Sequence, residues 1–69
     1  MKVNGAEFKK MRENRLLGPY NLAKLAGISP SIIKSIEQGG SPRLESIRKV
    51  LAALDITVEE AYQKRMLEE

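Results

Sequence analysis

The sequence predicts an all-α fold, in which five short helices pack into one compact domain that spans residues 1–69. Apolar residues recur at spacings of three and four, the period of an α-helix, and no stretch alternates as a half-buried strand would. Glycine, proline and serine interrupt these stretches at short intervals. A chain of 69 residues is long enough for one small domain, and its short connections leave no room for a linker.

The first part of the chain contains two predicted helices. The first covers residues 5–15, and the second covers residues 19–25. Pro19 suits the start of the second helix, because the N–H that proline lacks would be unpaired at that position anyway. Gly27 ends it, since glycine readily adopts the left-handed conformation that terminates many helices. The side chains expected to face inward are Phe8, Met11, Arg12, Arg15, Leu22, Ala23 and Ala26.

The other three helices are indicated by their starts. Ser29–Pro30 and Ser41–Pro42 each combine an N-cap serine with proline at the first helical position. Thr57 and Glu60 have the spacing of a capping box, in which each residue's side chain accepts a hydrogen bond from the other's backbone. The expected inward positions of these helices are Ile33, Ile36, Leu44, Ile47, Val50, Leu51, Leu54, Val58 and Ala61.

The second and third helices have the spacing of a helix-turn-helix, over about residues 19–38. Ala23, Gly27 and Ile33 lie at positions i, i+4 and i+10. A small residue lets the two helices approach closely, a glycine permits the turn, and a branched residue fixes the crossing.

The residue inventory excludes several classes of function. There is no Cys and no His, so disulfides, thiolate or imidazole metal sites and catalysis by these groups are ruled out. Ser31 and Lys34 match the S-x-x-K pattern of serine acyl-enzymes, but the further motifs of such enzymes are missing. We therefore expect no enzymatic activity, no metal and no small-molecule cofactor.

No segment resembles a signal peptide or a membrane span. The longest apolar run, residues 50–54, is far below the ~20 residues that a bilayer requires. The expected location is therefore the cytoplasm, with no membrane partner. The net charge is +3 and basic residues crowd the first quarter of the chain, which fits either an anionic partner or simple solubility.

Five sequence blocks resemble the Xre-type helix-turn-helix regulators, the family of the phage repressors and Cro. In order, they are "FKKMRE", "NLAKLAGIS", "IKSIEQG", "SPRLESIRKVLAALDI" and "TVEEAY". They extend from Phe8 to Tyr62 without obvious gaps. The resemblance implies a lambda-repressor-like domain that binds double-stranded DNA and represses transcription. The protein would be of bacterial or phage origin and associated with the nucleoid.

The resemblance also implies roles for particular residues. The third helix would enter the major groove of DNA, and Arg12 and Glu37 would form a structural ion pair. Arg12 lies on an apolar stripe, where an unpaired charge would be unfavourable. The residues expected to face the bases are Pro30, Ser31, Ile32, Lys34 and Ser35. Those expected near phosphates are Pro19, Tyr20, Ser29, Gln38, Gly40, Ser41 and Arg43.

Departures from the family pattern leave a second interpretation open. The reading helix lacks the Gln, Asn and Arg side chains that make bidentate base contacts, and Leu16 stands where the family usually has glycine. We expect a homodimer on a near-palindromic operator, with Ile56, Tyr62 and Met66 at the dimer surface. The alternative is a protein-interaction module, such as an antitoxin-like or accessory helix-turn-helix protein, whose main partner is another protein.

Overall fold

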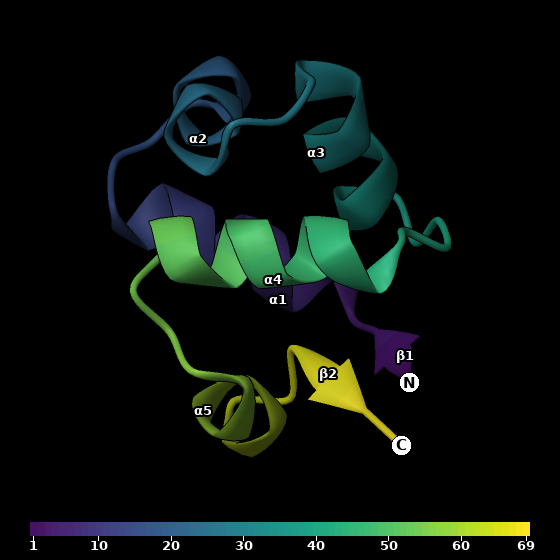
Figure 1. Cartoon of the computed structure of the whole chain (residues 1–69). Coiled ribbons are helices and arrows are strands. Elements are labelled where there is room, and N and C mark those ends of the chain that lie inside the picture. Colours follow the sequence, from purple (N-terminus) through teal and green to yellow (C-terminus); the bar gives the residue numbers. More distant parts are fainter.

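The computed structural model describes all residues, 1–69, and confirms the prediction of five helices. The helices are α1 (Gly5–Asn14), α2 (Pro19–Ala26), α3 (Pro30–Glu37), α4 (Leu44–Ala53) and α5 (Val58–Gln63). α2 and α3 lie together on one side of α1 and α4, and α5 lies on the opposite side (Figure 1). None of these helices is both long enough and apolar enough to cross a membrane.

A small sheet joins the two ends of the chain, and the expectation of no strands was wrong. β1 (Lys2–Val3) pairs antiparallel with β2 (Leu67–Glu68). The backbone N–H of Asn4 extends the pairing by donating to the carbonyl of Met66 at 2.8 Å. Strands of two residues are too short to produce an alternating pattern, and they pair only because the helices bring the two ends together.

Thirteen buried hydrophobic residues form a single core to which all five helices contribute. Leu44 and Val58 were expected to face inward, but 50% and 49% of their surface is exposed. Each is the first residue of its helix and lies beyond the edge of the core. Arg15 is also exposed, at the end of α1. The core residues are Phe8, Leu22, Ala23, Ile33, Ile36, Ile47, Val50, Leu51, Leu54, Ile56, Ala61, Met66 and Leu67.

The starts of α3 and α5 follow the sequence prediction. The Ser29 side chain accepts a hydrogen bond from the backbone N–H of Ser31 at 3.2 Å. Thr57 and Glu60 form both bonds of the capping box, each at 3.1 Å. These contacts join residues two or three positions apart, which is why the sequence alone predicts them.

α4 begins two residues later than predicted. Arg43, not Ser41, is the N-cap residue, and its side chain makes no capping bond. The first backbone hydrogen bond of the helix runs from the N–H of Ile47 to the carbonyl of Arg43, at 3.2 Å. Pro42 therefore belongs to the connection, because residues 39–43 must span the distance from the end of α3 to the start of α4.

All five helices end in the same way. In each, a residue in the left-handed conformation donates to a carbonyl three residues back, and the next residue donates to a carbonyl five residues back. This is the Schellman motif, which satisfies carbonyls that would otherwise lack partners at a helix end. The left-handed residues are Leu16, Gly27, Gly39, Asp55 and Arg65.

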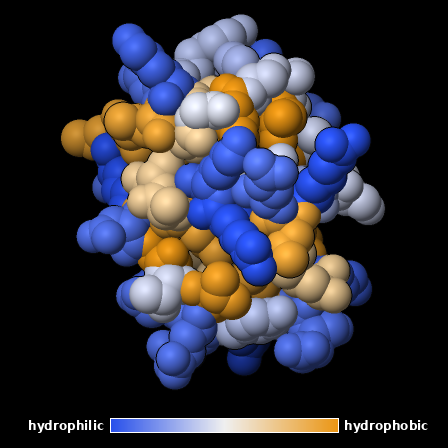
Figure 2. All heavy atoms as spheres, in the orientation of Figure 1, coloured by the Kyte–Doolittle hydropathy of each residue, from blue (hydrophilic) through white to orange (hydrophobic).

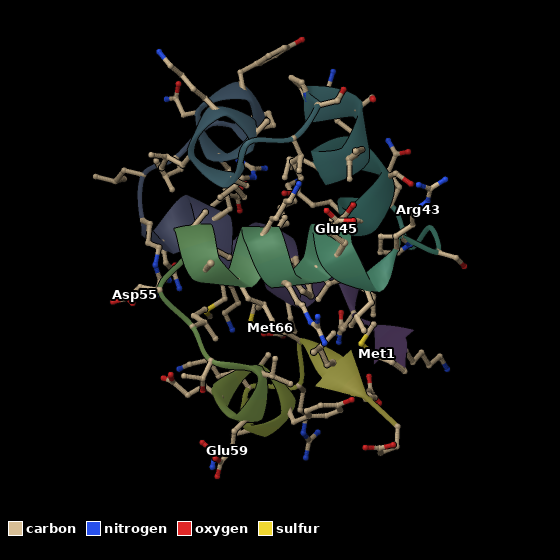
Figure 3. The ribbon with its side chains drawn as sticks, in the orientation of Figure 1. Met1, Arg43, Glu45, Asp55, Glu59 and Met66 are labelled. Carbon is tan, nitrogen blue, oxygen red and sulfur yellow. The ribbon has the colours of Figure 1, made fainter.

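The helix ends correct the prediction of the dimer surface. The residue after a left-handed cap often packs back onto its own helix, and here that residue is Ile56 after α4 and Met66 after α5. Both are buried, at 5% and 0% exposed, and Met66 lies in the interior between α4 and α5 (Figure 3). Neither side chain is available to another chain. Tyr62 is half-buried and is the only one of the three predicted residues that keeps exposed surface.

Candidate nucleic-acid interface

α3 is held against the rest of the molecule along its inner face and at its end. Ile33 and Ile36 are each 1% exposed in the core. Gly5 of α1 packs against the last turn of α3, where a Cβ atom on this glycine would lie 2.5 Å from the carbonyl oxygens of Ile36 and Glu37. Only glycine permits so close an approach of the two backbones. α3 is thereby a rigid support for the side chains on its outer face.

Arg12 and Glu37 form the ion pair that ties α1 to the end of α3. The guanidinium donates to both carboxylate oxygens, through Nε at 2.6 Å and Nη2 at 2.9 Å, and Nη1 donates to the carbonyl of Leu17 at 2.8 Å. The side chains are 8% and 11% exposed. The hydrogen bond to Glu37 raises the pKa of Arg12 above its ordinary value, so the guanidinium stays charged. Its burial leaves Arg12 a structural residue rather than a contact for phosphate.

The outer face of α3 is short and polar. Ser31, Lys34 and Ser35 are exposed, whereas Pro30 and Ile32 are half-buried. The hydroxyl of Ser31 lies 2.9 Å from that of the cap residue Ser29, so these two groups form one small hydroxyl pair at the start of the helix. The five side chains expected to face the bases thus share one end of the molecule, and three of them are fully accessible.

Lys34 is the one long donor on this face, and it leans toward α2. Its Nζ lies 5.4 Å from the centroid of the Tyr20 ring, a cation–π distance. Tyr20 follows Pro19 at the start of α2 and is 64% exposed. The first backbone bond of α2 runs from Leu22 to Gly18, so the N–H groups of Tyr20 and Asn21 have no backbone acceptor.

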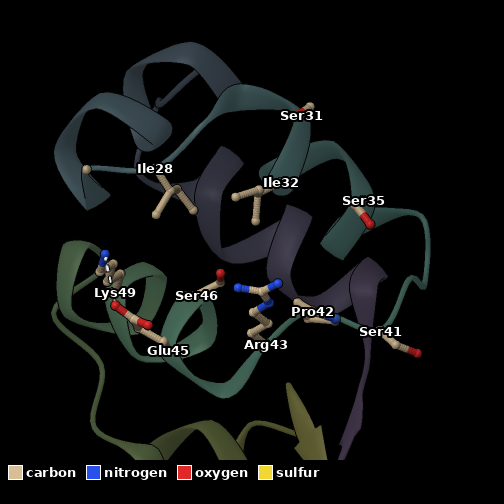
Figure 4. A pocket seen from close by; sticks show the side chains of 11 residues that line it. Ile28, Ser31, Ile32, Ser35, Ser41, Pro42, Arg43, Glu45, Ser46 and Lys49 are labelled. Atoms are coloured by element: carbon tan, nitrogen blue, oxygen red, sulfur yellow. Dashed lines mark ion pairs between the residues drawn. The ribbon is translucent and has the colours of Figure 1, made fainter.

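A cleft of about 570 Å³ separates α3 from the start of α4 (Figure 4). Ile28 and Ile32 form its apolar side beneath α2 and α3, and Arg43 extends its guanidinium into the space from the α4 side. Lys49 lies on the same side of the cleft and pairs with Glu45 at 3.4 Å. Arg43 makes no ion pair, so its positive charge is free.

A second hollow lies on the other side of the exposed serines. It is lined by Lys34, Gln38, Gly39 and Gly40, together with Ser31 and Ser35, which also line the cleft. Ser31 and Ser35 therefore form a ridge between two hollows.

Four of the seven residues expected near phosphates line the hollows beside this ridge: Gln38, Gly40, Ser41 and Arg43. The other three lie at helix starts, Pro19 and Tyr20 in α2 and Ser29 at the cap of α3. Gln38, Gly40 and Ser41 follow α3, and Arg43 precedes α4 at the edge of the molecule (Figure 3). On the face that carries α4, hydrophilic side chains lie at the centre and around the rim, with hydrophobic areas between them (Figure 2).

The sequence interpretation did not assign six of the eleven residues that line the cleft to the site: Gly27, Ile28, Pro42, Glu45, Ser46 and Lys49. Glu45 and Lys49 have the i, i+4 spacing of a helical ion pair, which predicts that both lie on one exposed face of the helix. Nothing local indicates that this face meets α3, because that depends on the path of residues 39–43 between the two helices.

Comparison with known proteins agrees with this geometry. A family model described as helix-turn-helix matches residues 8–60. The crystal structure of the restriction-modification controller protein C.AhdI from Aeromonas hydrophila has a similar fold, with a TM-score of 0.76. Its sequence is 32% identical, and the match covers 81% of this chain and 86% of that one. No curated protein is significantly similar in sequence. The chain belongs to the Xre/Cro-type helix-turn-helix family, whose members are DNA-binding transcription regulators and not enzymes.

Proposed function

We propose that this regulator binds a specific double-stranded DNA sequence as a homodimer, reads the major groove with α3 and represses transcription. The observation that carries the proposal is the anchoring of α3. Core packing holds its inner face, and the close approach of Gly5 and the Arg12–Glu37 ion pair hold its C-terminal end to α1. Its polar outer face is left exposed. Rigid support of this kind is what a reading helix requires, since base contacts depend on accurate placement.

The proposed base contacts come from the side chains on the outer face of α3. Ser31 and Ser35 would face base edges, and Pro30 and Ile32 would offer apolar contact, for example to a thymine methyl group. Lys34 is the only long donor on this face. Serine hydroxyls discriminate weakly between bases, so we expect modest direct readout and a contribution from the shape of the DNA.

The proposed phosphate contacts lie on both sides of α3. The start of α2 at Pro19 and Tyr20 would face one strand, with Ser29 nearby. Gln38, Gly40, Ser41 and Arg43 would face the other strand. Backbone N–H groups at helix starts bind anions well, so glycine and proline at such places need not contribute a side chain.

The proposed dimer surface is the exposed face of α5. Tyr62 keeps part of its surface accessible there, and Val58 is 49% exposed on the same helix. A two-fold dimer would present two copies of α3 to successive major grooves, about 34 Å apart, on a near-palindromic operator. Repression would follow if the occupied operator overlapped the binding site of RNA polymerase. The similar protein C.AhdI is a controller of restriction-modification, which also fits a role in gene regulation.

Selection of bound sequences from random duplexes tests the proposal directly. We expect a near-palindromic motif, and an affinity that falls steeply as salt rises from about 50 to about 200 mM, because phosphate contacts release counterions. Ser31→Ala should weaken binding by about 1–3 kcal/mol at one base position. Its control, Ser41→Ala, should weaken binding to all sequences alike.

The same experiment decides between this proposal and the alternative of a protein-interaction module. If the protein binds no duplex with salt dependence at low salt, DNA reading is refuted. Capture of a tight protein partner by the same preparation would then favour the module.

A further inference from the structure

Tyr20 is an exposed aromatic residue that the hydrophobic core does not use. It is 64% exposed and belongs neither to the core nor to the partly buried residues packed against it. The Lys34 ammonium lies over its ring, at 5.4 Å from the centroid. The contact joins the first turn of α2 to the middle of α3, and so it bridges the two helices of the helix-turn-helix.

The charge of Lys34 is otherwise uncommitted. The two ion pairs of the structure are formed by other residues. Lys34 also lines only the hollow on the far side of the Ser31–Ser35 ridge, and not the cleft between α3 and α4. The contact with Tyr20 places its ammonium next to α2.

We propose that Tyr20 is a positioning residue for Lys34, and that the pair contacts a backbone phosphate of the DNA strand beside α2 rather than a base. This inference rests on the proposed function. It revises the expectation that Lys34 faces the bases and gives Tyr20 a role through its ring.

The physical reason is preorganisation. The negative face of an aromatic ring attracts an ammonium group, and this restricts a side chain that would otherwise lose its rotamer freedom on binding. A lysine ammonium has three N–H donors, so those directed away from the ring stay free for phosphate oxygens. Contact with phosphate adds affinity that depends on salt but is the same for every sequence.

The first experiment needs no DNA. In the free protein, the ring current of Tyr20 should shift the ε-methylene proton resonances of Lys34 upfield from those of Lys64, an exposed lysine at the end of α5. Tyr20→Phe should preserve this shift and Tyr20→Leu should abolish it. If the Lys34 resonances coincide with those of Lys64 in the unchanged protein, the pair does not form and the inference is wrong.

The second experiment measures binding to the selected operator and to scrambled duplexes. Lys34→Ala should weaken binding to both by the same factor and reduce the slope of log affinity against log salt by about one. The control Lys64→Ala should leave affinity and slope unchanged. A change in base preference caused by Lys34→Ala would overturn the inference.

A double-mutant cycle then tests whether the two residues act together. Tyr20→Leu and Lys34→Ala should be non-additive by about two- to fivefold in affinity, the range expected of an exposed cation–π pair. In the Tyr20→Phe background, which retains the ring and loses only the hydroxyl, Lys34→Ala should cost as much affinity as it does in the unchanged protein. In the Tyr20→Leu background it should cost less.

The outcomes separate this inference from the proposed function. Additive effects of Tyr20→Leu and Lys34→Ala, or a loss of the coupling in the Tyr20→Phe background, would overturn the pairing while DNA reading stands. If the unchanged protein binds no DNA, the proposed function and the phosphate contact both fail.

Discussion

At the scale of single residues, the Arg12–Glu37 pair is the most sensitive point of the fold. Arg12 is only 7% exposed, and Glu37→Ala would leave its guanidinium without its carboxylate partner. Breaking a buried pair by removing one member costs about 3–5 kcal/mol, and we expect the lower end because the side chains keep 8% and 11% exposure. Chemical denaturation should therefore show about 3 kcal/mol less stability, a large share of the total for a small domain.

The double variant Arg12→Met/Glu37→Leu is the control for this prediction. Replacing both charges with apolar side chains of similar size removes the need for pairing, so most of the lost stability should return. An unchanged melting temperature in Glu37→Ala would mean that the pair does not stabilise the fold.

Leu16 is a second residue with a clear expected effect. It has a φ of 57° and is 93% exposed, so its backbone is strained while its side chain buries almost nothing. Glycine is free of this strain but has more freedom in the unfolded chain, so Leu16→Gly should stabilise by about 0.5–1 kcal/mol. In a thermal melt this corresponds to a rise of about 2–8 °C.

Two other left-handed positions serve as comparisons for Leu16. Asp55→Gly, at φ 58°, should stabilise less, because aspartate tolerates this conformation better than leucine does. Gly27→Ala, at φ 72°, should destabilise although no atom lies within 4 Å of the added Cβ. A lower melting temperature for Leu16→Gly would contradict the strain argument.

At the scale of elements, local contacts were predictable from the sequence and long-range ones were not. Ser29 and Thr57 cap their helices through bonds to residues two or three positions away, so a short stretch contains the whole interaction. Ser41 and Pro42 have the same pattern as Ser29 and Pro30, yet α4 starts later, because its start depends on where residues 39–43 join it to α3.

Helix ends explain the most consequential error. The sequence interpretation placed the dimer surface on the fifth helix and the loop before it, with Ile56 in that loop and Met66 on the helix. Left-handed residues at Asp55 and Arg65 turn the chain back, so these side chains enter the core. Neither aspartate nor arginine is the glycine that usually marks such a turn, and therefore the sequence carried no clear signal.

The start of α5 should respond to acid. The backbone N–H of Thr57 donates to the Glu60 carboxylate, and this bond is the main cause that lowers the pKa of Glu60 below its ordinary value of 4.5. The folded state therefore binds this proton less readily than the unfolded state. The stabilisation is fully present above about pH 4.5 and is lost as the pH falls through the lowered pKa.

Thermal melts of Glu60→Gln across the acid range test this prediction. Glutamine keeps an oxygen that can accept the bond from Thr57 but does not titrate. The unchanged protein should be the more stable of the two near neutral pH, and its advantage should shrink as the pH falls below about 4.5. Parallel melting curves across the whole range would show that the carboxylate makes no pH-dependent contribution.

At the scale of the whole molecule, the family resemblance predicted more of the site than residue spacing alone could. Spacing indicated a helix-turn-helix, but the link between Arg12 and Glu37 spans 25 positions and has no local pattern. The cleft between α3 and α4 and the pairing of β1 with β2 likewise arise from packing of the complete chain. These features follow from the fold, so they become visible only once the fold is known.

The proposed dimer leads to a prediction that separates folding from assembly. Val58 is the first residue of α5, where glutamate suits the helix dipole, so Val58→Glu should fold normally. The new charge would be desolvated in an apolar interface, and sedimentation equilibrium should therefore show a monomer where the unchanged protein is a dimer. Ala6→Glu, an equivalent change in the exposed first turn of α1, should leave the dimer intact.

The affinity for operators with different spacing between their half-sites is a second measurement on the same variants. Two reading helices fixed about 34 Å apart require half-sites on one face of the DNA, so an insertion of about 5 base pairs between them places one half-site on the opposite face. The unchanged protein should then lose at least about tenfold in affinity, whereas Val58→Glu, which binds each half-site separately, should be insensitive to the insertion. Equal affinities of the unchanged protein for both spacings would show that it reads DNA as a monomer, because only a rigid dimer couples the two half-sites.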